Sequence, residues 1–61
     1  MRDKGPPAVE LSAKSCDGGI AHSCENLARL YGRGEGVAKD ISRAQALRQR
    51  ACDLGEKSSC K

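Results

Sequence analysis

One cysteine pattern that occurs twice constrains this chain more than any other feature. The first copy, SCDGGIAHSC, covers residues 15–24, and the second, ACDLGEKSSC, covers residues 51–60. In each copy seven residues separate the two cysteines. A shift of 36 places residues 8–25 on residues 44–61, with seven of 18 positions identical and both cysteines among them. A period near 36 is typical of units built from two helices, so the sequence indicates an internal repeat of helical hairpins.

The spacing of apolar residues agrees with this interpretation. Apolar side chains recur at helical spacing over residues 20–31, and Gly32 follows them as a stop signal. A second stripe over residues 41–54 follows Asp40, whose carboxylate can accept backbone N–H groups at a helix start. Gly55 then ends the stripe. Both segments therefore predict helices, joined by a glycine-rich loop.

The internal repeat extends the prediction to the two ends. It predicts a helix over residues 8–17 and the first turn of a further helix over residues 57–61, with residues 1–7 as an N-terminal tail. Residues 8–61 then form a repeat region of about one and two-thirds units. We therefore expect an all-α fold, a fragment of an α/α solenoid made of antiparallel helix pairs.

The composition shows how little core such a chain can bury. Of its 61 residues 38% are hydrophobic, and Tyr31 is the only aromatic residue. At least about three repeats are normally needed for a continuous core, so we expect a piece of a longer array or a small protein that depends on cross-links. The net charge of +3 is dispersed and argues against a nucleic-acid partner. No apolar run approaches the ~20 residues of a membrane helix.

Nearly the whole chain after Pro7 resembles the Sel-one-like repeat, a tetratricopeptide-like family. The resemblance rests on Leu30, Tyr31, Gly34, Gly36, Val37, Asp40, Ala44, Ala51 and Gly55. Cysteines at both ends of the short turn resemble the cysteine-rich branch catalogued as the Hcp beta-lactamase family. The resemblance implies a solenoid that binds peptides or proteins. It also implies that some members are secreted or periplasmic and that some interact with penicillins.

The cysteines are predicted to be cross-links. A short turn folds the first two helices antiparallel, which can bring Cys16 and Cys24 within disulfide reach, and the repeat gives Cys52 and Cys60 the same arrangement. Each bond would stabilise the domain by about 2.5 kcal/mol in the chain-entropy model. Connectivity is not readable from sequence alone, so buried free thiols stay open as an alternative.

The cysteines also bear on metal binding and on the cellular compartment of the protein. Structural zinc usually takes cysteines about two to four residues apart, so we expect no metal and no cofactor. Disulfides would place the protein in the periplasm or outside the cell, although no signal peptide is visible, and free thiols would place it in the cytoplasm.

Four polar residues on the helix over 20–31 are candidates for partner binding: His22, Glu25, Asn26 and Arg29. Asn26 and Arg29 are three residues apart and share a helix face. An Asn amide can pair with a peptide backbone, and an Arg can take a carboxylate, so the two are predicted to contribute to a peptide-binding groove. Arg48, on the later helix, is expected to be an ordinary solvated charge.

We therefore expect a protein- or peptide-binding adaptor with no catalytic residues, whose partners could include neighbouring repeats of a longer array. The rival interpretation, implied by the resemblance, is a beta-lactamase-family protein that binds or slowly hydrolyses penicillins. SSCK at residues 58–61 has the form S-x-x-K, but the S-D-N and K-T-G elements of serine beta-lactamases are missing. A third interpretation is a purely structural segment of an array.

Overall fold

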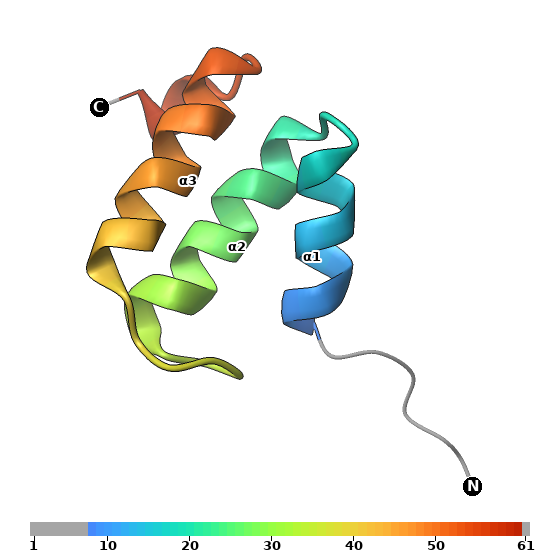
Figure 1. The fold of residues 1–61 in the computed structure, drawn as a ribbon. Coiled ribbons are helices and arrows are strands. Elements are labelled where there is room, and N and C mark those ends of the chain that lie inside the picture. Colours follow the sequence, from blue (N-terminus) through green and yellow to red (C-terminus); the bar gives the residue numbers. More distant parts are fainter. Residues whose placement is uncertain (1–7, 61) are drawn as a thin grey trace, which may run out of the picture.

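Helices make up most of residues 8–60, the part of the chain that the computed structural model describes (Figure 1). The elements are α1 (Ala8–Asp17), α2 (Ala21–Arg33), α3 (Ile41–Asp53) and a short 3-10 helix, η1 (Lys57–Ser59). No strand occurs within that range, so the prediction of an all-α fold is confirmed. The wider solenoid stays a prediction. The tail predicted over residues 1–7 lies outside the described residues.

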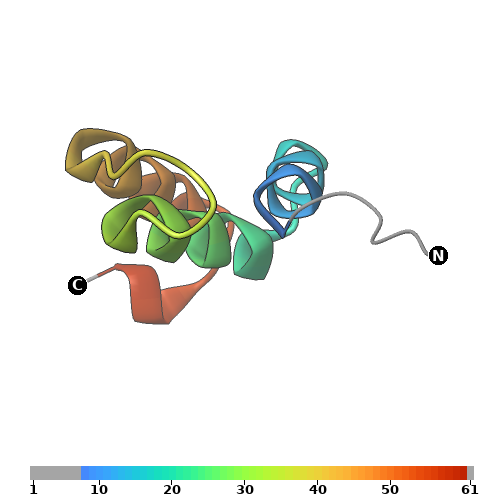
Figure 2. The same ribbon diagram turned by 90° about the horizontal axis from the view of Figure 1, so that it is seen from below.

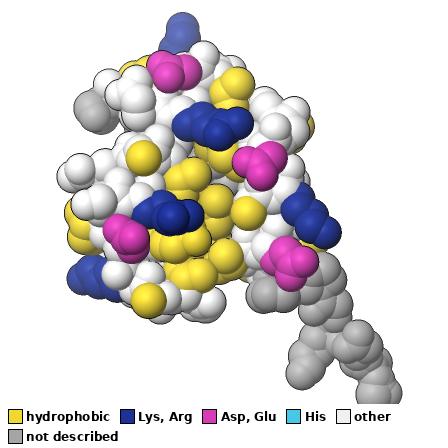
Figure 3. Space-filling model, viewed as in Figure 1, with side chains coloured by type: hydrophobic (Ala, Val, Ile, Leu, Met, Phe, Trp, Pro, Cys, Tyr) yellow, Lys and Arg dark blue, Asp and Glu magenta, His cyan; other side chains and the backbone are white. Residues whose placement is uncertain are grey.

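α2 is the central helix and packs against both α1 and α3. In the view from below, α1 and α3 lie toward one side of α2, and the segment that carries η1 lies toward the other (Figure 2). Hydrophobic side chains gather in the middle of the face shown in Figure 3, and charged side chains lie across and around them. The three helices thus form a bent layer, with η1 on one side of α2.

The core is built from small side chains. The buried residues are Ser12, Cys16, Cys24, Leu27, Ala28, Ala44 and Ala51. Cys16, Cys24 and Ala51 pack together, and the half-buried Leu47 packs against them. Among the described residues Leu27 is the largest buried side chain, and so small a core contributes little hydrophobic free energy, since that energy scales with the apolar area removed from water. The first disulfide is therefore part of the core as well as a cross-link.

The two cysteine-bearing turns share one backbone conformation. The N–H of Ile20 donates to the carbonyl of Ser15 at 3.1 Å, and the N–H of Glu56 donates to the carbonyl of Ala51 at 2.9 Å. These pairs stand 36 residues apart in the sequence. Gly19 and Gly55 occupy matching positions, with φ of 94° and 114°. The internal sequence match therefore corresponds to a repeated local structure.

The end of α2 differs from the prediction. We predicted that Gly32 would stop this helix, but α2 continues to Arg33, and Gly34 adopts the left-handed conformation with φ 73°. The N–H of Gly34 donates to the carbonyl of Leu30 at 2.8 Å, which closes the helix end. The prediction was wrong because Gly32 lies where α2 meets α3: a Cβ built there would be 3.8 Å from the Cβ of Ala44.

The last two elements also differ slightly from the prediction. Asp40 caps α3 as expected, since its Oδ1 accepts the N–H of Arg43 at 3.0 Å. The helix ends at Asp53, one residue before the predicted end, and Leu54 is the C-cap. The predicted first turn of a further helix is a 3-10 turn over Lys57–Ser59, while Lys61 lies outside the described residues.

The two glycines at the end of α2 predict opposite effects of the same substitution. Gly34→Ala should destabilise the fold by about 1–2 kcal/mol, because a Cβ at positive φ is strained. That Cβ would also lie 3.2 Å from the Cβ of Lys39. Gly32→Ala should stabilise the fold by about 0.5–1 kcal/mol, because alanine is the better residue inside a helix and the added Cβ would make an ordinary van der Waals contact with Ala44. Urea denaturation followed by circular dichroism measures both, and effects of equal sign would contradict the assignment of the helix end.

Candidate protein-binding groove between α2 and α3

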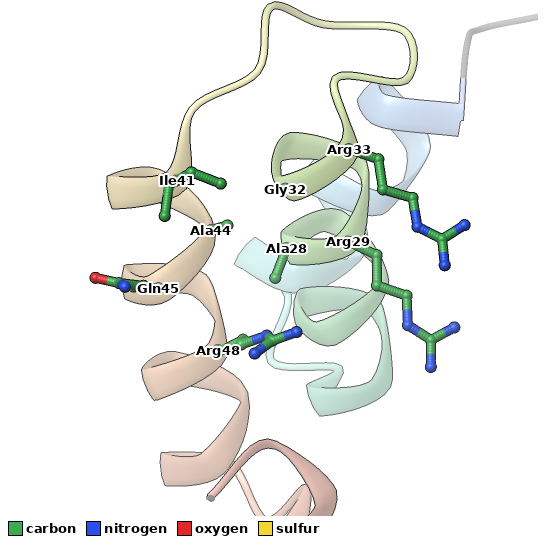
Figure 4. Close-up of a pocket in the computed structure, with 8 residues that line it drawn as sticks. All are labelled: Ala28, Arg29, Gly32, Arg33, Ile41, Ala44, Gln45 and Arg48. Carbon is green, nitrogen blue, oxygen red and sulfur yellow. The ribbon is translucent and has the colours of Figure 1, made fainter.

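A groove of about 370 Å³ runs between α2 and α3 (Figure 4). We refer to it as the α2–α3 groove, and its lining residues are Ala28, Arg29, Gly32, Arg33, Ile41, Ala44, Gln45 and Arg48. On each helix the residues recur at intervals of one, three or four, so each set shares one helix face. The groove therefore forms only where the faces of α2 and α3 meet, and no short sequence motif encodes it.

The floor of the groove is made of small residues. Ala28 and Ala44 are buried, and Gly32 is half-buried beside them. Short side chains let two helix backbones approach closely and leave room for another group above them. Ile41, at one end, keeps 50% of its surface exposed. The floor can therefore offer apolar contact to an occupant.

The walls of the groove are basic. Arg29 and Arg33 project side by side from α2 on the side away from α3, whereas Arg48 projects from α3 toward α2 (Figure 4). Glu35 lies 3.8 Å from Arg33, whereas no carboxylate of the described residues forms an ion pair with Arg29 or Arg48. A guanidinium carries five donors and binds carboxylates in a two-pronged geometry. The groove is thus suited to an occupant with both apolar and acidic groups.

Asn26 and Arg29, the pair predicted to form a groove, lie in different surroundings. Arg29 lines the α2–α3 groove. The Nδ2 of Asn26 donates to the Oγ of Ser12 at 2.8 Å, which joins α2 to α1. Arg48, expected to be an ordinary solvated charge, lies in the groove wall. Sequence spacing could not detect Arg48 because its role depends on α2 lying beside α3.

His22 and Glu25 lie beside the C-terminal turn. The side chain of His22 is 82% exposed, and its Nδ1 lies 4.0 Å from the Oε1 of Glu25. The hydroxyl of Ser58 lies 2.9 Å from the carboxylate of Glu25 and 2.8 Å from that of Glu56. A serine hydroxyl has one proton, so it donates to one carboxylate at a time. These contacts hold the C-terminal turn against α2.

The same contacts gather three groups that could bind a metal. Ligand atoms of His22, Glu25 and Glu56 lie within 4.8 Å of one another. The sequence did not predict this cluster, since Glu56 reaches α2 only through the tertiary fold. Carboxylates on a protein surface also gather without a metal, so the cluster by itself does not define a metal site.

All four cysteines are paired in the structure. Cys16 and Cys24 form one disulfide, with Cα atoms 4.6 Å apart, and Cys52 and Cys60 form the other, with Cα atoms 4.9 Å apart. The first disulfide is buried, whereas Cys52 is half-buried and Cys60 exposed. The two cross-links therefore have the same connectivity and different surroundings.

Residues 8–60 thus form an all-α unit that is cross-linked by disulfides and has a basic groove with an apolar floor. Within this range no helix is both long and apolar enough to cross a membrane. The groove has arginines around small apolar residues, and such a surface is suited to binding another molecule.

The chain is similar to two curated proteins. It is 43% identical over 47 residues to cytochrome c oxidase assembly factor 7A of Xenopus laevis, covering 77% of this chain and 20% of that protein. It is 42% identical over 64 aligned residues to cytochrome c oxidase assembly factor 7 of Xenopus tropicalis, covering 98% of this chain and 28% of that protein. The chain therefore spans less than a third of the length of these relatives. No family model and no solved structure matches it.

These comparisons correct the predicted family. The relatives are named as oxidase assembly factors, and no family model matches, so the assignment to the Sel-one-like repeats and the Hcp beta-lactamase branch was wrong. The tetratricopeptide-like and beta-lactamase interpretations fall with it. The physical reason is that glycines and alanines at helix contacts, with a capping Asp, serve any pair of closely packed helices. Those residues predict helical hairpins better than they identify a family.

Proposed function

We propose that this chain is a protein-binding segment that acts in the assembly of cytochrome c oxidase. The observation that carries the proposal is the similarity to cytochrome c oxidase assembly factor 7 of Xenopus tropicalis along 98% of the chain. The relatives are about four times longer, so this segment would supply one part of their role. The correction of the family removes the grounds for a beta-lactamase function.

The α2–α3 groove supports binding as that part of the role. Its apolar floor supplies area that an occupant can cover, and arginine is among the residues enriched in protein interfaces. Both walls of the groove are helices, and the buried disulfide packs against Ala51 of α3. A preformed groove of this kind loses little conformational entropy on binding, which favours affinity.

A chimera tests this function. Residues 8–60 replace the aligned segment of the Xenopus tropicalis factor, and the chimera is expressed in cells that lack this factor. We expect the chimera to restore assembled cytochrome c oxidase and its activity, because a segment that keeps its function should replace the aligned segment. A chimera present at normal abundance that restores no oxidase would contradict the proposal.

A matched chimera with Arg29→Ala and Arg48→Ala separates binding from a purely structural role. Both side chains are exposed, so their loss should leave the fold intact. If the segment binds a partner through the groove, oxidase assembly should fall while the abundance of the chimera stays unchanged. A purely structural segment would keep full activity.

A further inference from the structure

We infer that the outer face of α3 binds a helix of a partner protein that presents one carboxylate to Arg43, a second carboxylate to Arg50, and an apolar side chain between them. This inference rests on the proposed protein-binding function and assigns it a second surface and a partner of stated chemistry. The outer face of α3 is a shallow depression of about 490 Å³, lined by Asp40, Ser42, Arg43, Ala46, Leu47 and Arg50. These positions lie on the opposite side of α3 from those that line the α2–α3 groove.

The internal repeat shows that helices of the chain itself leave such a face exposed. At the shift of 36 residues, the outer face of α3 corresponds to the face of α1 that carries Glu10, Leu11 and Lys14. These three residues are exposed, although α2 and α3 both follow α1 in the chain. The residues of α1 that are buried are Ser12 and Cys16, on another face. The outer face of α3 is therefore the counterpart of a free surface, and a partner can reach it.

One substitution between the two halves leaves Arg50 without a carboxylate. On α1 the Nζ of Lys14 lies 3.8 Å from the Oε2 of Glu10, one turn earlier. On α3 the counterpart of Lys14 is Arg50, and the counterpart of Glu10 is Ala46. Within the described part of the chain no carboxylate forms an ion pair with Arg50. A partner can thus supply to α3 the carboxylate that α1 supplies to itself.

Arg43 is the second basic group of the outer face, and an aromatic ring holds it. Its Cζ lies 5.3 Å from the centre of the Tyr31 ring. A guanidinium placed over a ring keeps the N–H groups at its edge free to bind a carboxylate. The carboxylate of Asp40 is already engaged, since its Oδ1 accepts the backbone N–H of Arg43. A fixed guanidinium loses less conformational entropy when a partner binds it.

Tyr31 points to the same surface independently. It is the only aromatic residue of the chain, yet it is half-buried, while the buried core is made of smaller side chains. Tyrosine and arginine are among the residues that dominate the binding energy of protein interfaces. The contact between Tyr31 and Arg43 therefore adds a reason to regard the outer face of α3 as a docking surface.

The spacing of the residues favours a helix as the occupant. Arg43, Leu47 and Arg50 follow one another at intervals of four and three, so the two arginines are about 10.5 Å apart along the helix axis. A helix laid along α3 repeats the same spacing. An extended segment would bring unpaired backbone groups against α3, whose own backbone groups bond within the helix. An anionic membrane usually takes a cluster of about four to eight basic residues, more than this face offers.

Three synthetic peptides of equal length test the inference. The matched peptide is alanine-rich with capped ends, and it carries two glutamates seven residues apart with leucines between them. The second peptide has lysines in place of the glutamates. The third keeps the composition of the first but spaces the glutamates five residues apart, which turns them to different sides of the helix. Comparison of the first and third peptides separates geometry from net charge.

Each peptide is titrated into the isotopically labelled 61-residue chain with its disulfides intact, and backbone amide shifts are followed. We expect the matched peptide to shift the amides of residues 42–50. We expect it to bind about fivefold or more tightly than either of the other two, because two exposed ion pairs add to its affinity.

Charge reversals in the chain sharpen the test. Arg43→Glu combined with Arg50→Glu should invert the preference, so that the lysine peptide binds more tightly than the matched peptide. Arg48→Glu makes a charge reversal on the groove side of α3 and should keep the original preference. If the double variant loses helical circular dichroism, Arg43→Glu alone should abolish the preference, since an acidic residue is favourable in the first turn of a helix.

Substitution of the ring tests the role of the cation–π contact. Tyr31→Leu should weaken binding of the matched peptide about threefold, because it removes the ring beneath Arg43. Tyr31→Phe keeps the ring and should keep the affinity. Equal effects of the two substitutions would show that the ring does not hold Arg43 for binding.

Several results would overturn the inference. These are equal binding of the two glutamate peptides, shifts confined to the α2–α3 groove, and an unchanged preference in the reversed variants. Inorganic phosphate that moves the same amides as far as the matched peptide does would identify a small-anion site instead. Binding to vesicles of phosphatidylglycerol and phosphatidylcholine, without binding of the matched peptide, would identify a membrane surface. A chimera that restores oxidase while the matched peptide fails would leave the proposed function standing.

Discussion

Replacing Cys16 and Cys24 together by alanine should cost about 2.5 kcal/mol or more in the free energy of unfolding. The chain-entropy model gives about 2.5 kcal/mol for a loop of this length. The structure adds a second cost, since both sulfurs are buried against Ala51. A domain with so small a core has little stability to spare, so we expect this variant to be largely unfolded. Urea denaturation followed by helical circular dichroism measures the loss.

The second disulfide provides the matched control. Cys52→Ala with Cys60→Ala opens a loop of identical length, so the entropy model taken alone predicts the same cost. Cys60 is exposed, and η1 has no buried residue. The segment that follows α3 can therefore detach while α1, α2 and α3 stay packed. We expect less than about 1 kcal/mol of global loss, a local opening rather than unfolding. Equal losses in the two variants would show that loop entropy, and not burial, governs the effect.

Ala51→Leu should destabilise the fold by about 1–3 kcal/mol, because added methylenes in a packed site force side chains and backbone to shift. Ala51 is 0% exposed and lies against the disulfide between Cys16 and Cys24, with Leu47 beside it. The extra side chain would push α3 away from the turn between α1 and α2. The midpoint of urea denaturation reports the loss of stability.

Ala46→Leu is the control for this substitution. Ala46 is on the same helix, and it is exposed. Leucine and alanine have similar helix propensities, so the change should stay within about 0.5 kcal/mol. If both substitutions have the same small effect, α3 does not pack on the disulfide as the structure shows.

Features that depend on near neighbours in the chain were accessible from the sequence. The helices followed from apolar spacing, and the cap of α3 followed from Asp40, because each involves residues within one or two turns. The pairing of Cys16 with Cys24 was predicted for the same reason, since a short turn limits where the second cysteine can lie. The family prediction was wrong, because the residues that build helical hairpins are shared by many proteins.

Features that depend on how helices meet were decided only by the tertiary structure. Apolar spacing predicted that Gly32 would end α2, whereas the structure has Gly32 inside the helix beside Ala44 of α3 and has Gly34 in the left-handed conformation.

The partners of polar side chains also required the tertiary structure. Their spacing on α2 grouped Asn26 with Arg29 as one candidate site. In the structure Asn26 donates to Ser12 of α1, whereas Arg29 lines the groove between α2 and α3. The sequence by itself predicted the helices, the repeated turn and the favoured pairing of the cysteines, because these depend on local backbone geometry, whereas the structure shows the two disulfides. The placement of Arg48 beside α2 depends on the position of α3, and packing between segments distant in sequence decides that position.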